Sequence, residues 1–213
     1  MDGCRSGWVV TALDADRRSM EFMLVPTFAE VVSRALAAAA CAVDVPIGLR
    51  EDFTPRACDV GARQLLGRQA SSIFLAPPRR LLGCTSQAEA SAISRAQCGR
   101  GVSIQAFHLF AKIAEVDRTL PAPVFEAHPE LAFRARAGGQ DLPRKKTAEG
   151  YAARRQLLAA WTGIPAREQA RLWGSAAVPD DLLDAAVLAD VAWCRTRGEA
   201  RHVGDPNEAL IWY

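Results

Sequence analysis

The chain has 213 residues, of which 50% are apolar and 23% are charged, and its formal net charge at pH 7 is +2. This length suits one domain with a sizeable core, and the composition is that of an ordinary globular protein. The small net charge excludes the global positive field of strongly basic nucleic-acid binders. The most apolar stretch, residues 35–43, is far too short to span a membrane, so we expect no membrane segment.

The N-terminal residues and the cysteines indicate a cytoplasmic protein. The opening Met-Asp-Gly-Cys-Arg lacks the apolar core of a secretory signal. The six cysteines lie far apart and include no C-x-x-C pair, which argues against a structural zinc site and against a disulfide framework. We therefore expect the protein to work in a reducing cytoplasm.

The first 45 residues predict a hairpin, a helix and a buried strand. In Trp8–Val25 two apolar strands flank a polar turn, which predicts a hairpin. Thr27 and Glu30 have the spacing of a capping box and predict a helix that runs to about Ala40. Cys41–Val45 is a short apolar run, typical of a buried strand in a parallel sheet.

The rest of the chain predicts a helical insertion at about residues 50–120, a strand at Val124–His128 and a helical C-terminal part. This order indicates a single α/β domain over residues 1–213 with mixed strand pairing. No glycine-rich turn follows the first strand, which argues against a doubly wound nucleotide binder and against a phosphotransferase. The predicted helices are 58–66, 86–97, 104–116, 147–161, 166–173 and 181–197.

Two carboxylates interrupt apolar strands. Asp44 lies in the first buried strand and Glu126 in the second. Burying an unpaired charge is costly, so each acid must be paired, protonated or bound to a metal ion. A structural role, in which either acid caps the next turn or meets an arginine, remains an open alternative.

The predicted helix 181–197 carries a pair of acids on one face. Asp181 and Asp184 are three residues apart and project from the same side. Asp184 also shares a stripe with apolar residues that should pack on the sheet, whereas Asp190 lies off this stripe and is expected in solvent. The helix macrodipole explains an acid at Asp181 well and one at Asp184 poorly.

Acids that come from separate strands and one helix are the ligands that Mg²⁺ and Mn²⁺ prefer. Two such ions, about 3.5–4 Å apart, can activate a water molecule and stabilise a leaving oxygen. His128 would face the same side of its strand as Glu126 and could assist proton transfer, or it is an ordinary hydrogen-bonded histidine. Arg79 and the basic run Arg144–Lys146 are either phosphate contacts or solvated surface.

Eight motifs, spread over nearly the whole chain, resemble a bacterial and archaeal family. That family is catalogued as domain of unknown function 429 and described as predicted RNase H-like nucleases. The segments that carry the resemblance are 2–10, 43–49, 58–63, 71–79, 105–110, 124–130, 145–150 and 180–185.

The resemblance implies an RNase H-like mixed sheet flanked by helices, and it implies roles for five acids. Asp2 would be the acid of the first strand and Asp44 that of the fourth. Asp181 and Asp184 would be the acids of a final helix, and Glu126 an extra acid specific to the family. In relatives several apolar residues precede the Asp-Gly-Cys-Arg motif, and here only Met1 does. We therefore expect the first strand to be truncated in this sequence, with a few N-terminal residues missing.

The sequence thus predicts a metal-dependent nuclease or phosphodiesterase. Asp2, Asp44 and Asp184 would hold Mg²⁺ or Mn²⁺ and, with Asp181 and Glu126, would form the catalytic set. Arg79, Lys145, Lys146 and His128 would contact a nucleic acid or nucleotide substrate. The alternative is a non-catalytic nucleic-acid or protein-binding module that keeps the fold and uses its acids structurally.

Overall fold

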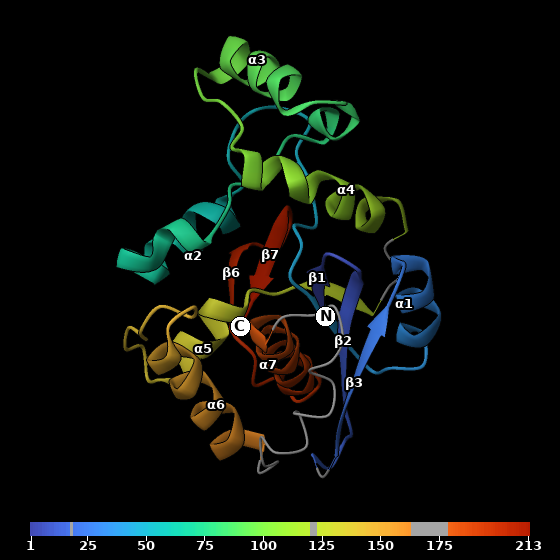
Figure 1. Ribbon diagram of the computed structural model, residues 1–213, viewed down its shortest axis with the longest axis vertical. Helices are drawn as coiled ribbons and strands as arrows, with labels where there is room; N and C mark the ends of the chain where they lie inside the picture. The colour runs from blue at the N-terminus through green and yellow to red at the C-terminus, as the bar shows by residue number, and fades with distance from the viewer. Residues whose placement is uncertain (18, 120–122, 163–178) are drawn as a thin grey trace.

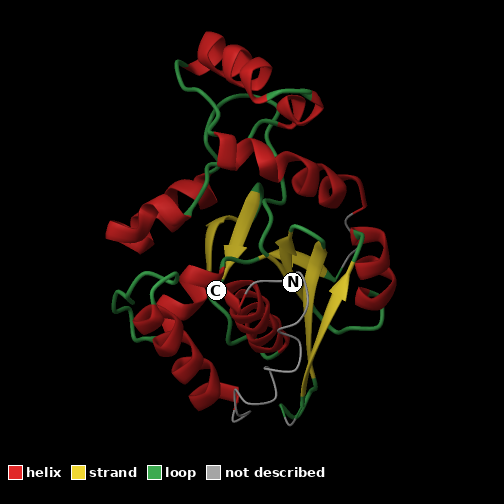
Figure 2. Ribbon diagram, viewed as in Figure 1, coloured by secondary structure: helices red, strands yellow, loops and turns green. Residues whose placement is uncertain are grey.

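The computed structural model describes residues 1–17, 19–119, 123–162 and 179–213. The strands gather in the middle of the molecule and the helices surround them (Figures 1 and 2). The mixed α/β class predicted from the sequence is confirmed. The helix predicted at 166–173 falls outside the described residues. Among the described residues, none of the helices has the length and apolar character that crossing a membrane requires.

An antiparallel sheet is formed by the N-terminal strands β1 (Asp2–Cys4), β2 (Gly7–Leu13) and β3 (Met20–Val25), in the order β1-β2-β3. The turn between β1 and β2 needs Gly7, whose φ is +140° and whose Cβ would lie 2.2 Å from the Val25 carbonyl oxygen. Asp2–Cys4 is a short strand, although the resemblance to relatives leaves only Met1 before it.

The second sheet is parallel and pairs β4 (Cys41–Val43) with β5 (Val124–Glu126). Backbone hydrogen bonds of Met1 connect it to the N-terminal sheet. The Met1 ammonium donates to the Ala42 carbonyl oxygen at 2.8 Å, and the Asp44 amide donates to the Met1 carbonyl oxygen at 3.1 Å. β1 and β4 therefore lie side by side, with Asp2 and Asp44 at neighbouring positions.

A C-terminal hairpin of β6 (His202–Asp205) and β7 (Ala209–Trp212) extends the sheet beyond β5. The His128 amide donates to the Trp212 carbonyl oxygen at 3.2 Å, which fixes β7 beside the end of β5. Sequence patterns do not predict this hairpin, because its strands are short and alternate imperfectly between apolar and polar residues.

The helices of the body cover the sheet. α7 (Pro179–Thr196) packs against β1, β2 and β4, and buries an almost continuous apolar surface between Leu182 and Val191. α5 (Pro129–Arg136) and α6 (Ala148–Thr162) also pack on α7. α1 (Phe28–Ala35) lies against β2 and β3. Thr27 caps α1 as predicted, but α1 ends at Ala35 and not near Ala40.

The middle of the chain forms a helical region above the sheet, with α3 and α4 in the upper lobe of Figure 1. Its helices are α2 (Ala57–Leu66), α3 (Gln87–Cys98) and α4 (Ile104–Thr119), and two 3₁₀ helices cover Gly67–Ser72 and Arg79–Gly83. α2 packs on the C-terminal hairpin, and α4 packs on α1. The region is therefore supported by both ends of the chain and overhangs the strand ends that carry the acids.

Candidate active site

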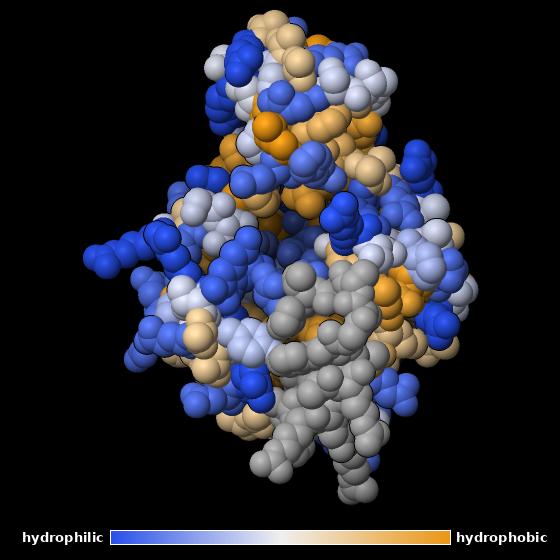
Figure 3. Space-filling model, viewed as in Figure 1, coloured by the Kyte–Doolittle hydropathy of each residue, from blue (hydrophilic) through white to orange (hydrophobic). Residues whose placement is uncertain are grey.

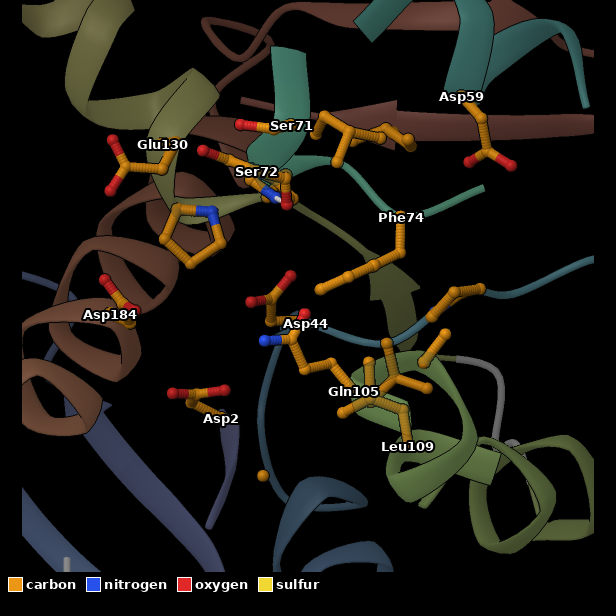
Figure 4. A pocket seen from close by; sticks show the side chains of 18 of the residues that line it. Asp2, Asp44, Asp59, Ser71, Ser72, Phe74, Gln105, Leu109, Glu130 and Asp184 are labelled. Carbon is orange, nitrogen blue, oxygen red and sulfur yellow. Dashed lines mark hydrogen bonds between the residues drawn. The ribbon is translucent and has the colours of Figure 1, made fainter. Parts of the chain in front are cut away.

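A cavity of about 790 Å³ lies between the strand ends of the body and the helical region. Its wall on the body side carries acids and lysine, and its opposite wall is formed by the segment 71–77 and one face of α4. Figure 4 shows the carboxylates of Asp2, Asp44 and Asp184 pointing toward a common space in this cavity.

Each of these three acids comes from a different element. Asp2 is the first residue of β1, and Asp44 follows the last residue of β4. Asp184 lies in the second turn of α7, on the face that packs on the sheet, and is only 2% exposed. Because Met1 joins β1 to β4, the first two are placed by backbone hydrogen bonds. The sequence prediction that these three acids converge agrees with their placement.

Of the three acids, only Asp184 accepts a hydrogen bond from a described residue. Within the part of the chain that the structure describes, the carboxylates of Asp2 and Asp44 accept no hydrogen bond. Asp184 Oδ2 accepts one from Lys145 Nζ at 2.7 Å, and its buried Oδ1 has no partner. Buried oxygens without donors are costly, so this arrangement favours a cation in the common space.

The pKa values of the three acids are raised, first by burial and then by the neighbouring charges. Burial raises the pKa of Asp2 well above its usual range, and the charges of Asp44 and Asp184 raise it further. Burial likewise raises the pKa of Asp44 to about 6 and that of Asp184 to about 7, although Lys145 acts in the opposite direction on both. The three acids therefore release their protons at higher pH than ordinary carboxyl groups, and a cation bound among them would compete with these protons.

Lys145 comes from the loop before α6. Burial acts to lower its pKa, but the charges of Asp184, Asp2 and Asp44 raise the pKa above its ordinary value. Arg154 fixes this loop: it is 2% exposed, donates to the Pro143 carbonyl oxygen at 2.8 Å and pairs with Glu130 at 2.6 Å. The ammonium of Lys145 is thus a held cation and not a mobile surface group.

Glu126 is engaged elsewhere. Arg56 donates to both of its carboxylate oxygens, at 2.7 and 2.9 Å, and the Ile47 amide donates to one of them at 2.7 Å. Arg56 also pairs with buried Asp59, whose Oδ2 accepts from the Ala76 amide at 2.9 Å. Glu126 lines the cavity, but its bonds are those of a structural acid that locks the segment 71–77 to the sheet.

The other predicted residues divide between the cavity and its surroundings. His128 and Lys146 line the cavity; burial lowers the pKa of His128, so the ring is neutral at pH 7. Asp181 does not line the cavity, although its charge contributes to the raised pKa of Asp2. Arg79 is also outside the cavity lining and is held by Glu51 and Asp117.

Several residues that line the cavity are not predicted from sequence as site residues, among them Glu130, Phe74 and Gln105. Glu130 follows Pro129 at the start of α5 and is the buried partner of Arg154. Phe74 and Gln105 come from the helical region and reach the cavity only through its folding over the sheet. Their sequence signal is their presence in motifs of the resemblance, 71–79 and 105–110.

Divalent metal ions fit the donors in kind. Carboxylate oxygens without partners, such as Asp184 Oδ1, are the hard ligands that Mg²⁺ and Mn²⁺ take. Within residues 1–17, 19–119, 123–162 and 179–213, however, no three His, Cys, Asp or Glu side chains form a closed group around a metal position. The structure therefore has the donor chemistry of a metal site without a preformed ligand shell.

Fold and site together define a mixed α/β protein with an acidic cavity at the ends of its central strands. The chain belongs to the family described as "Protein of unknown function (DUF429)", whose model matches residues 1–209. Searches of the curated proteins and of the solved structures give no match.

Proposed function

We propose that this protein is a divalent-metal-dependent nuclease or phosphodiesterase with an RNase H-like domain. The observation that carries the proposal is the convergence of Asp2, Asp44 and Asp184 on one cavity, with a partnerless buried oxygen on Asp184. The fold assignment is supported by where the acids lie: one on β1, one directly after β4 and a pair on α7. The resemblance implies this same distribution.

In this proposal Asp2, Asp44 and Asp184 hold Mg²⁺ or Mn²⁺. When bound there, such an ion supplies an activated water and stabilises negative charge on the phosphoryl group. Lys145 stays beside Asp184 and stabilises the anionic substrate, and Lys146 and Arg144 on the same loop contact further phosphates. Neutral His128 can accept a proton through its buried, partnerless Nδ1. The charges of Asp44 and Asp184 contribute to the raised pKa of Asp2, and a bound cation would relieve this repulsion by taking the place of protons.

The location of the protein in the cytoplasm is part of the same proposal. All six cysteines are free thiols in the structure, as is usual in a reducing compartment.

A second candidate, a non-catalytic binding module, is favoured by one observation. Lys145 already pairs with Asp184, and buried acids that serve only structure are paired in this way. The two candidates differ at Asp44. In an enzyme, Asp44→Asn abolishes turnover and leaves stability intact or raises it, whereas in a structural role the same substitution lowers stability and leaves metal binding unchanged.

The test of the proposed function is calorimetric titration of Mn²⁺ and Mg²⁺ into the metal-free protein, repeated with Asp184→Asn. We expect saturable binding that Asp184→Asn removes or weakens at least about tenfold, as loss of a charged ligand does. Glu21→Gln is the matched control, because Glu21 is an exposed carboxylate on β3, outside the cavity.

Hydrolysis of a generic phosphodiester then completes the test. Turnover that depends on the metal and is lost in Asp184→Asn would support the enzyme. Absence of metal binding at millimolar concentration, both alone and with a phosphodiester present, would refute it.

A further inference from the structure

The wall of the cavity that faces the carboxylates is mainly apolar. We call this wall the roof; it consists of the segment Ile73–Pro77 and the α4 residues Gln105, Ala106 and Leu109. Phe74 is 42% exposed and Leu109 36%, although both belong to a hollow of the molecule. Figure 3 shows hydrophobic residues inside the hollow below the upper lobe. Exposed apolar groups gathered in a concave site, opposite charged groups, are typical of a ligand-binding surface.

The Phe74 ring has no stacking partner. Within the described residues no aromatic ring or cation packs on it, whereas other rings, such as Trp8 and Phe133, each have a cation over their face. Figure 4 shows Phe74 extending from its segment into the cavity, on the side of Asp44. The backbone of this segment is fixed, since the Ala76 amide donates to buried Asp59. The ring is thus presented on a rigid support, with one face open to a planar group.

The Gln105 amide is a second open group of the roof. Figure 4 shows its side chain pointing from α4 toward Asp44 and Asp2. It makes no hydrogen bond within the part of the chain that the structure describes. A free amide offers a donor pair and an acceptor, which suit the edge of a nucleobase or a phosphate oxygen.

Size and charge restrict what can occupy the space between roof and carboxylates. A volume of about 790 Å³ is that of a small-ligand pocket, and the roof closes it on the side opposite the acids. Arg68, Arg144 and Lys146 line the same cavity and suit an anionic ligand. A ligand with a flat apolar face and a phosphate fits these walls, while a base pair within a duplex keeps its faces covered by its neighbours.

We propose that the cavity takes an unpaired nucleotide, with its base stacked on Phe74 and its phosphate at the carboxylate wall. The inference rests on the proposed function in one respect, since a cation held by the acids places the phosphate. The substrate class is then a free nucleotide derivative or the unpaired end of a single strand, and not an intact duplex. Stacking of one base on an aromatic side chain strengthens binding by roughly tenfold or more.

The experiment measures binding without turnover. Adenosine 5′-monophosphate and ribose 5-phosphate, which differ only in the base, are titrated in the presence of Mg²⁺ into the full chain and three variants. Phe74→Ala removes the ring, Phe74→Tyr keeps it, and Leu65→Ala is the matched control. Leu65 is 41% exposed, close to Phe74 in exposure, and lies on α2 outside the cavity.

We expect the wild type, Phe74→Tyr and Leu65→Ala to bind the nucleotide at least about tenfold more tightly than the base-free sugar phosphate. Phe74→Ala should lose this preference and keep its affinity for ribose 5-phosphate. Equal affinity of the wild type for the two ligands would overturn the proposal, and so would a preference that survives Phe74→Ala.

A short single-stranded oligonucleotide and its duplex identify the source of the nucleotide. Tighter binding of the single strand than of the monophosphate assigns the site to strand ends, and equal binding assigns it to free nucleotides; both support the unpaired base. Tighter binding of the duplex overturns it. The proposed function is tested separately, by metal binding to the wild type and Asp184→Asn. A base preference without metal binding would support stacking on Phe74, but it would refute both the nuclease and the placement of the phosphate at the carboxylate wall.

Discussion

Two carboxylates that line the cavity, those of Glu126 and Asp44, have opposite environments. Glu126 has its charge balanced by Arg56 and its oxygens occupied by three donors, whereas Asp44 accepts no hydrogen bond in the described part of the chain. A paired acid stabilises the fold, and its removal leaves a buried cation behind. An unpaired acid among other acids destabilises the fold and is available for binding. Amide substitutions of these two residues should therefore change stability in opposite directions.

Asp44→Asn should stabilise the metal-free protein at alkaline pH. The pKa of Asp44 is raised from 3.8 to about 6, so the folded protein keeps a proton that the unfolded chain has already released between these values. The free energy of unfolding therefore falls as pH rises through this window, and the loss is complete above it. We expect Asp44→Asn to be more stable than wild type by roughly 3 kcal/mol at pH 8 and nearly equal to it near pH 4.

Urea denaturation in the presence of a chelator, at both pH values, checks this expectation. Glu21→Gln, in which an exposed carboxylate is replaced, should show no such pH-dependent difference. A lower stability of Asp44→Asn at pH 8 would mean that Asp44 is a structural acid.

Glu126→Gln should destabilise the protein at neutral pH. The amide keeps the shape of the side chain but removes the charge opposite Arg56, which is 2% exposed and retains only Asp59 as an acidic partner. Because breaking a buried ion pair is costly, we expect a loss of roughly 3 kcal/mol by urea denaturation. If stability is unchanged while turnover disappears, Glu126 belongs to the catalytic set after all.

At the scale of elements, the local sequence pattern predicts those helices and strands that local interactions stabilise. The Thr27 cap, the hairpin of β2 and β3 and the apolar face of α7 are all evident in the sequence, and the structure contains them. Elements stabilised by distant contacts are missed. The strands of the C-terminal hairpin have only four residues each, and their place beside β5 depends on long-range pairing.

In the candidate site, too, some residues are predicted from local sequence patterns and others are not. Asp44 and Asp184 are conspicuous because each interrupts an apolar pattern, while Phe74 and Gln105 are ordinary until the helical region folds over the sheet. Asp190, expected in solvent, is completely buried and paired with Arg17 and Arg136. The charges that compensate it come from β-turn and helix segments far away in sequence, so periodicity along α7 alone could not reveal them.

The start of α6 determines the position of Lys145. Gly150 lies so close to the preceding loop that a Cβ there would be 2.1 Å from the Arg144 carbonyl oxygen. Gly150→Ala must therefore displace the backbone next to Lys145, and overpacking of this kind costs about 1–3 kcal/mol.

Urea denaturation checks the effect of Gly150→Ala, with Gly83→Ala as the control. Gly83 has open space around its Cβ position and no positive φ, so its substitution should be neutral or slightly stabilising. Equal free energies of unfolding for the two variants would show that the loop moves away from the new Cβ atom without loss of stability.

At the scale of the whole molecule, a net charge of +2 conceals a local separation of charge. The acids Asp2, Asp44 and Asp184 and the basic residues Arg68, Arg144 and Lys146 line the same cavity. Such an arrangement gives little long-range attraction for a polyanion but a strong local preference for where its phosphates lie. Binding of a single strand should accordingly involve few phosphates.

Lys146→Glu should weaken binding of a single-stranded oligonucleotide regardless of its sequence. Loss of one phosphate contact should also reduce the slope of log affinity against log salt concentration by about 0.7. Fluorescence anisotropy over a range of salt concentrations measures both effects. Arg201→Glu is the matched control, since Arg201 is exposed before β6 and outside the cavity. An equal effect of both substitutions would mean that only overall charge matters.

The contact between α2 and the C-terminal hairpin has a consequence for how the protein is made. Gly61 lies against Val203, and Gly204 lies against Cys58, so α2 lacks this part of its supporting surface until residues 202–212 have left the ribosome. Because synthesis proceeds from the N-terminus at about 5–20 residues per second, the segment that carries Phe74 is made well before its support exists. The two walls of the cavity therefore stay unassembled while residues 1–201 are translated, and the binding site forms only after β6 and β7 have emerged from the ribosome.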